Sequence, residues 1–362
     1  NNQVTYNNAT MEALDKAAEY IKWGQDMKRE DGPWIIAKGL ACGNKYTMSG
    51  STSSIIAKAH DDGTIEIRHY QIEMGQGCNT VMAQIAAEQF GITPDKVKIV
   101  FDDSAFCPFD HGTFCSRGTF MNGNAVIKTC KKLKEKVLTR GAEVLGVPAD
   151  QLDTKNGEVF EIANPEHKCT YKQMFNNGGW VPEQGELMAT SAFTYDEGTI
   201  DAETGQGKPV AYYSYGAIGI ELALNRDTGE VRILKSGGWY DAGQILNEKT
   251  IQGQIDGAVA MGIGQAVFEE TLFNSNGKII NGNYRDYKIP TMLDIPFNAG
   301  IESGFVGSPH KEGPYGAKGI GEVAMVPIMP AIANAINNAM DVKVNDLPMT
   351  KERVWRALHS EK

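Results

Sequence analysis

The sequence lacks the features that mark several classes of protein. No stretch approaches about 18 uninterrupted apolar residues, so no membrane-spanning helix is expected. There is no tract rich in Lys and Arg, and 35 basic against 45 acidic residues give a formal net charge of −10. Nucleic-acid binding is therefore disfavoured, because it depends on cations that neutralise phosphates. Since the first residues also show no secretory signal, we expect a soluble, cytoplasmic, globular protein.

Cysteine is scarce and scattered. The six cysteines form no Cys-x-x-Cys pair and no cluster with histidine at zinc-site spacing, and they lie at positions 42, 78, 107, 115, 130 and 169. An iron–sulfur site needs three or four closely spaced cysteines, which are also missing. We expect free thiols in a reducing compartment and no metal bound by side chains of this chain.

Glycine, in contrast, is abundant, with 40 of 362 residues. The glycines gather in short segments rather than in a low-complexity tract, around residues 74–77, 112–123, 236–238, 261–265 and 313–321. Glycine lets the backbone approach a ligand closely and adopt positive φ. Several such segments beside apolar helical patterns predict a ligand held by main-chain N–H groups.

The apolar periodicity predicts alternating hairpins and helices. Helices are expected over about 10–30, 80–90, 125–145, 249–270 and 325–340, hairpins over 53–69 and 219–235, and a strand over 97–101. A hairpin, a glycine-rich loop and a helix follow one another in each half, which predicts an α+β fold of two related lobes with mixed sheets. We place these lobes at 1–170 and 171–362, because turn residues and weak periodicity mark 150–185 as the boundary.

Gly75-Gln76-Gly77 stands directly before the helix expected from residue 80. Its glycines would let the backbone approach a ligand, the Gln76 amide can donate to an oxygen, and the helix N-terminus can face a phosphate. An ordinary strand-to-helix turn would use the same residues. The motif by itself leaves both interpretations open.

A second glycine-rich segment runs from His111 to Gly123 and also precedes a helix. Its hydroxyl groups, the guanidinium of Arg117 and its bare main chain are what a pyrophosphate requires. No Walker lysine follows, and no Gly-x-Gly-x-x-Gly opens a βαβ unit, which disfavours a P-loop or a Rossmann domain. A dinucleotide-like phosphate on another fold stays open.

Glu322 closes a third glycine-rich segment and precedes the last predicted helix. A carboxylate at this place can interact with a helix N-terminus, which is a structural role. It can also act as a general base, buried between the apolar neighbours Val323 and Met325. The residues alone favour neither role.

Six segments resemble motifs of the xanthine dehydrogenase/aldehyde oxidoreductase family of molybdenum hydroxylases, in the order that the family has. They are residues 73–77, 240–247, 253–265, 286–291, 316–322 and 345–348. The resemblance runs from about residue 36 to the C-terminus. The family's hammerhead domain and its Gly-Gly-x-Phe-Gly loop, in the first half of the large subunit, are not matched. The chain thus resembles the C-terminal half of a molybdenum-binding subunit encoded in two pieces, as in the nicotinate dehydrogenases.

The resemblance implies a chemistry and a set of partners. The enzyme would hydroxylate an electron-poor carbon with oxygen derived from water. Molybdenum would be held by molybdopterin cytosine dinucleotide, with a terminal sulfido or selenido ligand. The implied partners are a large subunit with the N-terminal half, an FAD subunit and a [2Fe-2S] subunit, with NAD(P) as the final electron acceptor.

The resemblance also implies roles for particular residues. Glu322 would be the catalytic base. The cofactor would be bound by Gly75, Gln76, Gly77, Ser116, Arg117, Gly118, Thr119, Gln265, Lys318 and Gly319. The substrate would be faced by residues expected between the first strand and the first hairpin, Tyr46, Thr47 and Met48. Tyr46 could equally be a half-buried aromatic residue of a loop.

The split subunit favours hydroxylation of nicotinate to 6-hydroxynicotinate. Hydroxylation of a purine such as xanthine, or of an aldehyde, is the alternative within the family. Outside it, the alternatives are a non-catalytic carrier of the molybdenum cofactor and an unrelated glycine-rich structural protein. The presence of Glu322 counts against a carrier, because a carrier needs no base.

Overall fold

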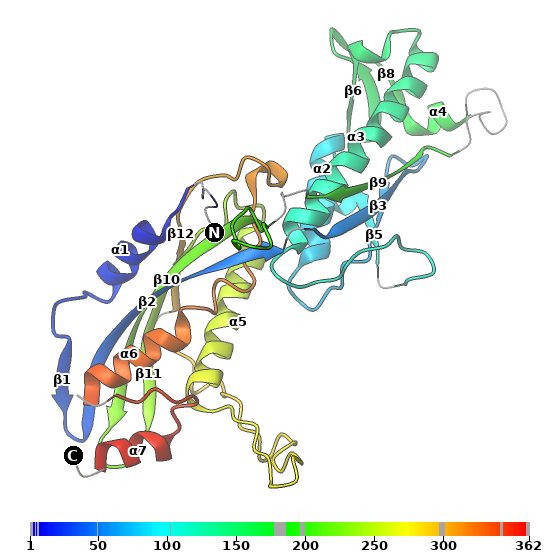
Figure 1. Cartoon of the computed structure of the whole chain (residues 1–362). Helices are drawn as coiled ribbons and strands as arrows, with labels where there is room; N and C mark the ends of the chain where they lie inside the picture. The colour runs from blue at the N-terminus through cyan, green and yellow to red at the C-terminus, as the bar shows by residue number, and fades with distance from the viewer. Residues whose placement is uncertain are drawn as a thin grey trace.

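The computed structural model describes residues 3, 5, 7–48, 50–101, 103–176, 186–195, 200–296, 301–340 and 343–359. They form two bodies, and the chain passes between them where strands end, as Figure 1 shows. Within these residues no helix is both long enough and apolar enough to cross a membrane.

The first body is built on a five-stranded sheet with the order β1-β2-β10-β11-β12. Its neighbours are antiparallel except for the parallel pair β11 and β12. The strands are β1 (Lys28–Asp31), β2 (Trp34–Met48), β10 (Val210–Asn225), β11 (Val231–Tyr240) and β12 (Ile301–Phe305). The helices are α1 (Thr10–Tyr20), α5 (Glu248–Val267), α6 (Ile328–Met340) and α7 (Lys351–His359).

Helices cover both faces of this sheet. Successive side chains of a strand point to opposite faces. Ala217 of β10 packs in one cluster with Ala13 and Ala17 of α1. Its neighbour Ile218 belongs instead to the large core shared with α5 and α6. β10 is therefore buried on both sides, which explains its nearly continuous run of buried residues.

The second body is built on a four-stranded sheet with the order β5-β4-β3-β9 and a three-stranded sheet with the order β6-β7-β8. The strands are β3 (Thr52–Ala59), β4 (Ile65–Arg68), β5 (Val97–Val100), β6 (Leu152–Lys155), β7 (Glu158–Glu161), β8 (Asn164–Thr170) and β9 (Met188–Thr194). The helices are α2 (Cys78–Phe90), α3 (Gly118–Leu145) and α4 (Tyr171–Asn176). The apolar faces of α2 and α3 share one core with the larger sheet.

The α+β class and most of the predicted elements are confirmed. The two hairpins are β3–β4 and β10–β11, both antiparallel. The first helix was expected to reach residue 30, but α1 ends at Tyr20. Lys28–Asp31 forms a strand that pairs with β2 across a turn containing Gly32. These residues therefore form β1, although the apolar periodicity had predicted a helix there. In the opposite direction, α3 begins at Gly118 rather than near 125.

The division into lobes at 170 and 171 remains a proposal. Part of the predicted boundary, residues 177–185, lies outside the described residues. The hydrogen-bonded sheets cross the proposed division, because β9 pairs with β3 and β10 pairs with β2. The sheets therefore unite segments that are far apart in the sequence.

Candidate functional site

A cavity of about 470 Å³ lies between the two bodies. It is lined by parts of four segments, residues 71–81, 113–119, 244–254 and 317–322. Three of these contain the glycine-rich stretches that the sequence singled out. Amide and hydroxyl side chains and glycine backbone line it beside apolar side chains such as Val81, Phe114 and Leu246, and among the described lining residues Glu322 is the only carboxylate.

Glu322 faces the cavity with a side chain that is 40% exposed. Its Oε2 accepts a hydrogen bond of 2.9 Å from Ser116 Oγ and lies 3.3 Å from Lys45 Nζ. This differs from the expected apolar burial, because Val323 points into the core while Glu322 points out of it. Nor does Glu322 cap a helix, since α6 begins only at Ile328. The purely structural role is thereby disfavoured.

The segment that carries Glu322 is fixed by three contacts with neighbouring elements. The Lys318 N–H donates to Ala242 O, the Gly319 N–H donates to the Tyr212 hydroxyl, and Ser214 Oγ donates to Gly319 O. A Cβ atom at Gly319 would lie 1.9 Å from Ser116 O. Only glycine allows this close approach, but its N–H is already used within the protein. Gly319 thus shapes the cavity rather than donating to a ligand.

The ammonium group of Lys318 is buried and paired inside the protein. It donates to Asp241 Oδ2 at 2.6 Å and to Tyr213 O at 3.2 Å. Burial raises the pKa of Asp241 in spite of the neighbouring ammonium. Lys318, predicted to bind the cofactor, lines the cavity, but its ammonium group and its N–H are already used within the protein.

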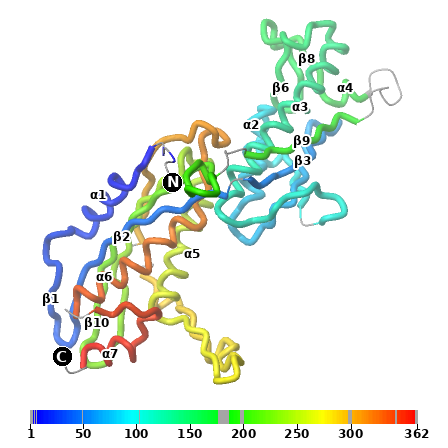
Figure 2. The backbone as a smooth tube through the Cα atoms, in the orientation of Figure 1, coloured from blue at the N-terminus to red at the C-terminus, as the bar shows by residue number. Residues whose placement is uncertain are grey.

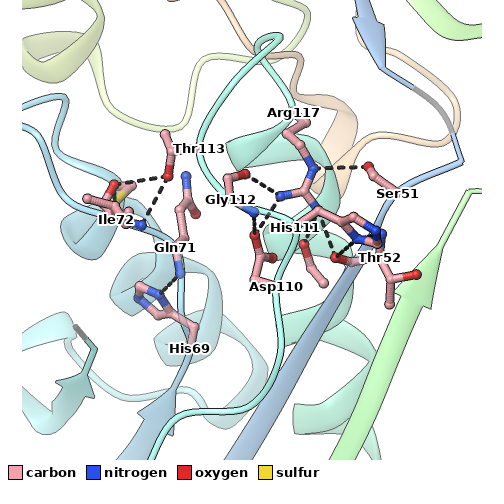
Figure 3. Close-up of polar contacts among 12 residues, drawn as sticks. Ser51, Thr52, His69, Gln71, Ile72, Asp110, His111, Gly112, Thr113 and Arg117 are labelled. Carbon is pink, nitrogen blue, oxygen red and sulfur yellow. Dashed lines mark hydrogen bonds and ion pairs between the residues drawn. The ribbon is translucent and has the colours of Figure 1, made fainter. Parts of the chain in front are cut away.

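Arg117 differs from its expected role in the same way (Figure 3). The guanidinium is fully buried and uses all five of its N–H groups within the protein. The acceptors are Ser51 Oγ, Thr52 O, Ser53 Oγ, Asp110 Oδ1 and Gly112 O. No N–H is left for a pyrophosphate. The side chain instead holds the 110–117 loop against β3.

The loop before α3 has an unusual backbone that other residues support. Cys115 and Ser116 have φ of 50° and 51°, which is rare for residues other than glycine. Thr47 Oγ1 donates to both of their carbonyl oxygens, at 3.2 and 3.1 Å. Thr47 is buried in β2 and supports this loop. It was expected to face the substrate, but it does not line the cavity.

The N-terminus of α3 is open towards the cavity. No side chain caps it, and Ser116, Gly118 and Thr119 line the cavity. The first N–H groups of a helix have no partner within the helix and carry its positive dipole end. These three residues, predicted to bind the cofactor, are brought together at a place suited to an anion.

Gln71 lies beside this helix terminus and was not found from the sequence. It lines the cavity and is buried, yet its Oε1 has no hydrogen-bond partner. A Cβ atom at Gly118 would lie 2.0 Å from its Nε2, so the carboxamide packs against the start of α3. Below it, the Gln71 N–H donates to His69 Nδ1, and burial lowers the pKa of His69 to about 4 (Figure 3). The unpartnered amide oxygen is a group that a ligand could satisfy.

The Gly75-Gln76-Gly77 loop differs from its predicted role in one respect. The carboxylate of Glu73 accepts the N–H groups of Gly75, Gly77 and Asn79. Burial raises the pKa of Glu73, but these hydrogen bonds outweigh it and hold the pKa below its usual value. A phosphate at the N-terminus of α2 would therefore meet a carboxylate. Gln76 still lines the cavity, with its Nε2 bonded to Ile72 O.

The remaining predicted residues are distributed unevenly. Gln265 does not line the cavity, because it lies near the C-terminal end of α5 while the cavity residues Thr250 and Gln254 lie near its start. Tyr46 and Met48 were expected in a loop, but they belong to the end of β2, which pairs with β10. Both are exposed, and they lie on the face opposite Thr47.

Several cavity residues were missed in the sequence. They are Gln71, Gln244, Asn247, Thr250 and Gln254, together with Lys45 beside Glu322. Gln244, Asn247 and Gln254 lie inside the 240–247 and 253–265 segments that carried the resemblance, so they could have been found there. Gln71, Thr250 and Lys45 lie in a loop or near the end of an element, where no motif or spacing distinguishes them. Among the described residues, no group of three or more His, Cys, Asp and Glu could hold a metal ion.

The chain matches a known family over most of its length. The family model described as molybdopterin cofactor-binding domain matches residues 13–296. A putative xanthine dehydrogenase molybdenum-binding subunit of Escherichia coli is 29% identical over 98% of this chain and 46% of its own length. The gamma subunit of the 6-hydroxypseudooxynicotine dehydrogenase complex of Paenarthrobacter nicotinovorans is 29% identical over 95% of this chain and 42% of its own.

Solved structures agree with this match. Quinoline 2-oxidoreductase from Pseudomonas putida 86 has the same fold, with a TM-score of 0.83 and 21% identity, over 99% of this chain and 47% of that one. The aldehyde oxidoreductase from Desulfovibrio desulfuricans gives a TM-score of 0.80 at 25% identity, over 98% of this chain and 36% of that one. The chain thus spans about half the length of these relatives or less.

Proposed function

Because this chain belongs to the molybdopterin cofactor-binding domain family, we propose that it is the C-terminal half of the molybdenum-binding subunit of a hydroxylase. The observation that carries this proposal is the placement of Glu322, the only carboxylate among the described lining residues, at the wall of a cavity that also presents amides and hydroxyls. Such a site combines one proton acceptor with many hydrogen-bond partners for a large polar cofactor.

The cavity suits a pterin dinucleotide. Amides and hydroxyls can pair with the edges of a pterin, and the unpartnered Oε1 of Gln71 supplies an acceptor. Since Arg117 and Lys318 are paired internally and the Ser116 hydroxyl donates to Glu322, a pyrophosphate would be held by the open N-terminus of α3 and by Thr119. A pyrophosphate is present in every dinucleotide form of the cofactor, and we propose the cytosine dinucleotide form. When bound, the cofactor supplies the redox chemistry, with a sulfido or selenido ligand on its molybdenum.

The residues of this chain then have separate tasks. Glu322 accepts a proton during the hydroxylation, and Ser116 orients its carboxylate. The exposed ring of Tyr46 offers a face or an edge to a flat substrate. A cofactor carrier would need none of these arrangements, which favours an enzyme.

We propose nicotinate, hydroxylated to 6-hydroxynicotinate, as the substrate. Two of the similar proteins are named for compounds that contain a pyridine ring, as nicotinate does, and others are named for xanthine and aldehydes. The purified complex should turn over nicotinate at least about tenfold faster, as kcat/KM, than xanthine, hypoxanthine or benzaldehyde. Turnover of purines or aldehydes without nicotinate would reject this substrate and leave the family unaffected.

We further propose that the other half of the site comes from the polypeptide that corresponds to the remaining length of the relatives. An FAD subunit, a [2Fe-2S] subunit and NAD(P) would complete the electron path. An arm of residues 271–294 supports a large interface, because it projects from the first body (Figure 2) and exposes many apolar side chains. They include Phe273, Ile280, Tyr284, Ile289, Met292 and Leu293, the last being 97% exposed. Several large apolar side chains exposed within one short segment are typical of a protein interface.

Changing Met292 and Leu293 together to Asp should weaken capture of the partner subunit at least tenfold. The physical reason is that forming the interface would remove water from two charged carboxylates, which costs binding free energy. The control is Ile162→Asp, also at an exposed apolar residue but beside the three-stranded sheet. Co-purification from a coexpression strain measures the effect. Equal capture of both variants would remove the arm from the interface.

A further inference from the structure

We propose that Lys45 is a positioning residue that fixes which oxygen of Glu322 accepts the proton. The inference rests on the proposed role of Glu322 as the base. It concerns a residue outside every motif that carried the resemblance.

Lys45 lies near the C-terminal end of β2 and contacts Glu322 from there. Its Nζ lies 3.3 Å from Glu322 Oε2, and its side chain is 17% exposed. β2 pairs with β10 so that Lys45 lies opposite Ser214, whose Oγ donates to Gly319 O. The strand that carries Lys45 and the segment that carries Glu322 are therefore tied to the same point of β10.

The ammonium group of Lys45 is itself well held. It donates to Tyr46 O at 2.9 Å and lies 4.0 Å from the centroid of the Tyr46 ring. A lysine on a fully exposed surface gains little from an ion pair, because it must give up side-chain freedom. Here the additional backbone and ring contacts already restrict that freedom. The pair with Glu322 can therefore orient the carboxylate.

The two donors act on the same carboxylate oxygen. Ser116 Oγ and Lys45 Nζ both approach Oε2, and none of the described residues donates to Oε1. The lone pairs of Oε2 face these two donors, whereas those of Oε1 are open to a proton. The geometry thus leaves Oε1 as the proton acceptor and prevents the carboxylate from rotating.

Other charges near the cavity cannot replace this contact. The Lys318 ammonium is paired with Asp241, and the Arg117 guanidinium is saturated. Tyr212, on β10, is buried and uses its hydroxyl on backbone groups of Ser116 and Gly319. Within the described part of the chain, Lys45 is the only Lys or Arg within 4.0 Å of the Glu322 carboxylate.

The test compares Lys45→Met and Lys45→Arg in the assembled complex. Lys45→Met should lower kcat by about 10- to 100-fold, because a base displaced by about 1 Å loses rate on that scale. KM, molybdenum content and CMP released by acid hydrolysis should stay within about twofold of the unmodified complex. Lys45→Arg should recover most of the rate. The matched control is Lys58→Met, which removes the Lys58–Glu186 ion pair in the second body.

A second measurement does not need turnover. The infrared carboxylate bands of Glu322, identified by difference from Glu322→Gln, should shift in Lys45→Met and stay unchanged in Lys58→Met. An unchanged band, an unchanged kcat, or a raised KM at normal kcat would each overturn the inference, the last by indicating a direct contact with substrate. If Glu322→Gln itself kept normal turnover, the proposed base would fail, while the infrared shift would still report whether Lys45 holds the carboxylate.

Discussion

Replacing Glu322 with Gln should lower turnover by about a thousandfold or more while the protein keeps its fold and its cofactor. General-base catalysis typically contributes about 10²- to 10⁴-fold to a rate. The carboxamide has the same shape, and its oxygen can still accept from Ser116 and Lys45, so the surrounding hydrogen bonds can persist. The change removes the proton acceptor and little else.

Steady-state rates and molybdenum analysis on the same preparation check this expectation. Glu248→Gln is the matched control, because Glu248 lies in the first turn of α5, close to cavity residues but not lining the cavity. It should retain normal turnover. Near-normal activity of Glu322→Gln at full molybdenum content would exclude Glu322 as the base.

Replacing Arg117 with Ala should destabilise the chain by about 3–5 kcal/mol and also abolish cofactor binding. The guanidinium and the carboxylate of Asp110 are both fully buried, so the variant leaves a buried charge without its partner. Five hydrogen bonds are lost at the same time, three to residues 51–53 at the start of β3 and two within the 110–117 loop. Because this loop leads into α3, the open helix terminus would lose its place at the cavity.

Denaturant unfolding measures the stability, and molybdenum together with released CMP measures the cofactor. Arg117→Lys should rescue little, since an ammonium cannot reproduce the planar set of five donors. Arg356→Ala, which removes an exposed pair with Glu352, should change stability by less than about 0.5 kcal/mol. A variant with normal stability but no CMP would instead favour a direct contact between Arg117 and the cofactor.

The local features of the fold follow from the sequence. Asp-Gly and Thr-Gly turns between alternating apolar residues define the two hairpins, because turn geometry and strand period are properties of neighbouring residues. The glycine-rich segments likewise indicated which loops meet a ligand, and three of them line the cavity. Glu322 could be singled out because it ends such a segment.

The partners of charged and polar side chains depended on the tertiary structure. Arg117 and Lys318 were expected to bind the cofactor, but the fold brings Asp110 and Asp241 to them, and these pairs form inside the protein. Glu73 accepts the N–H groups of Gly75 and Gly77, which leaves the open terminus of α3 as the place that we propose for an anion. Lys45 and Glu322 are separated by most of the chain and meet only because β2 pairs with β10. A charged group is buried only at a high free-energy cost unless it is paired. Which partner it pairs with depends on which distant segments pack together, and local sequence patterns do not determine that packing.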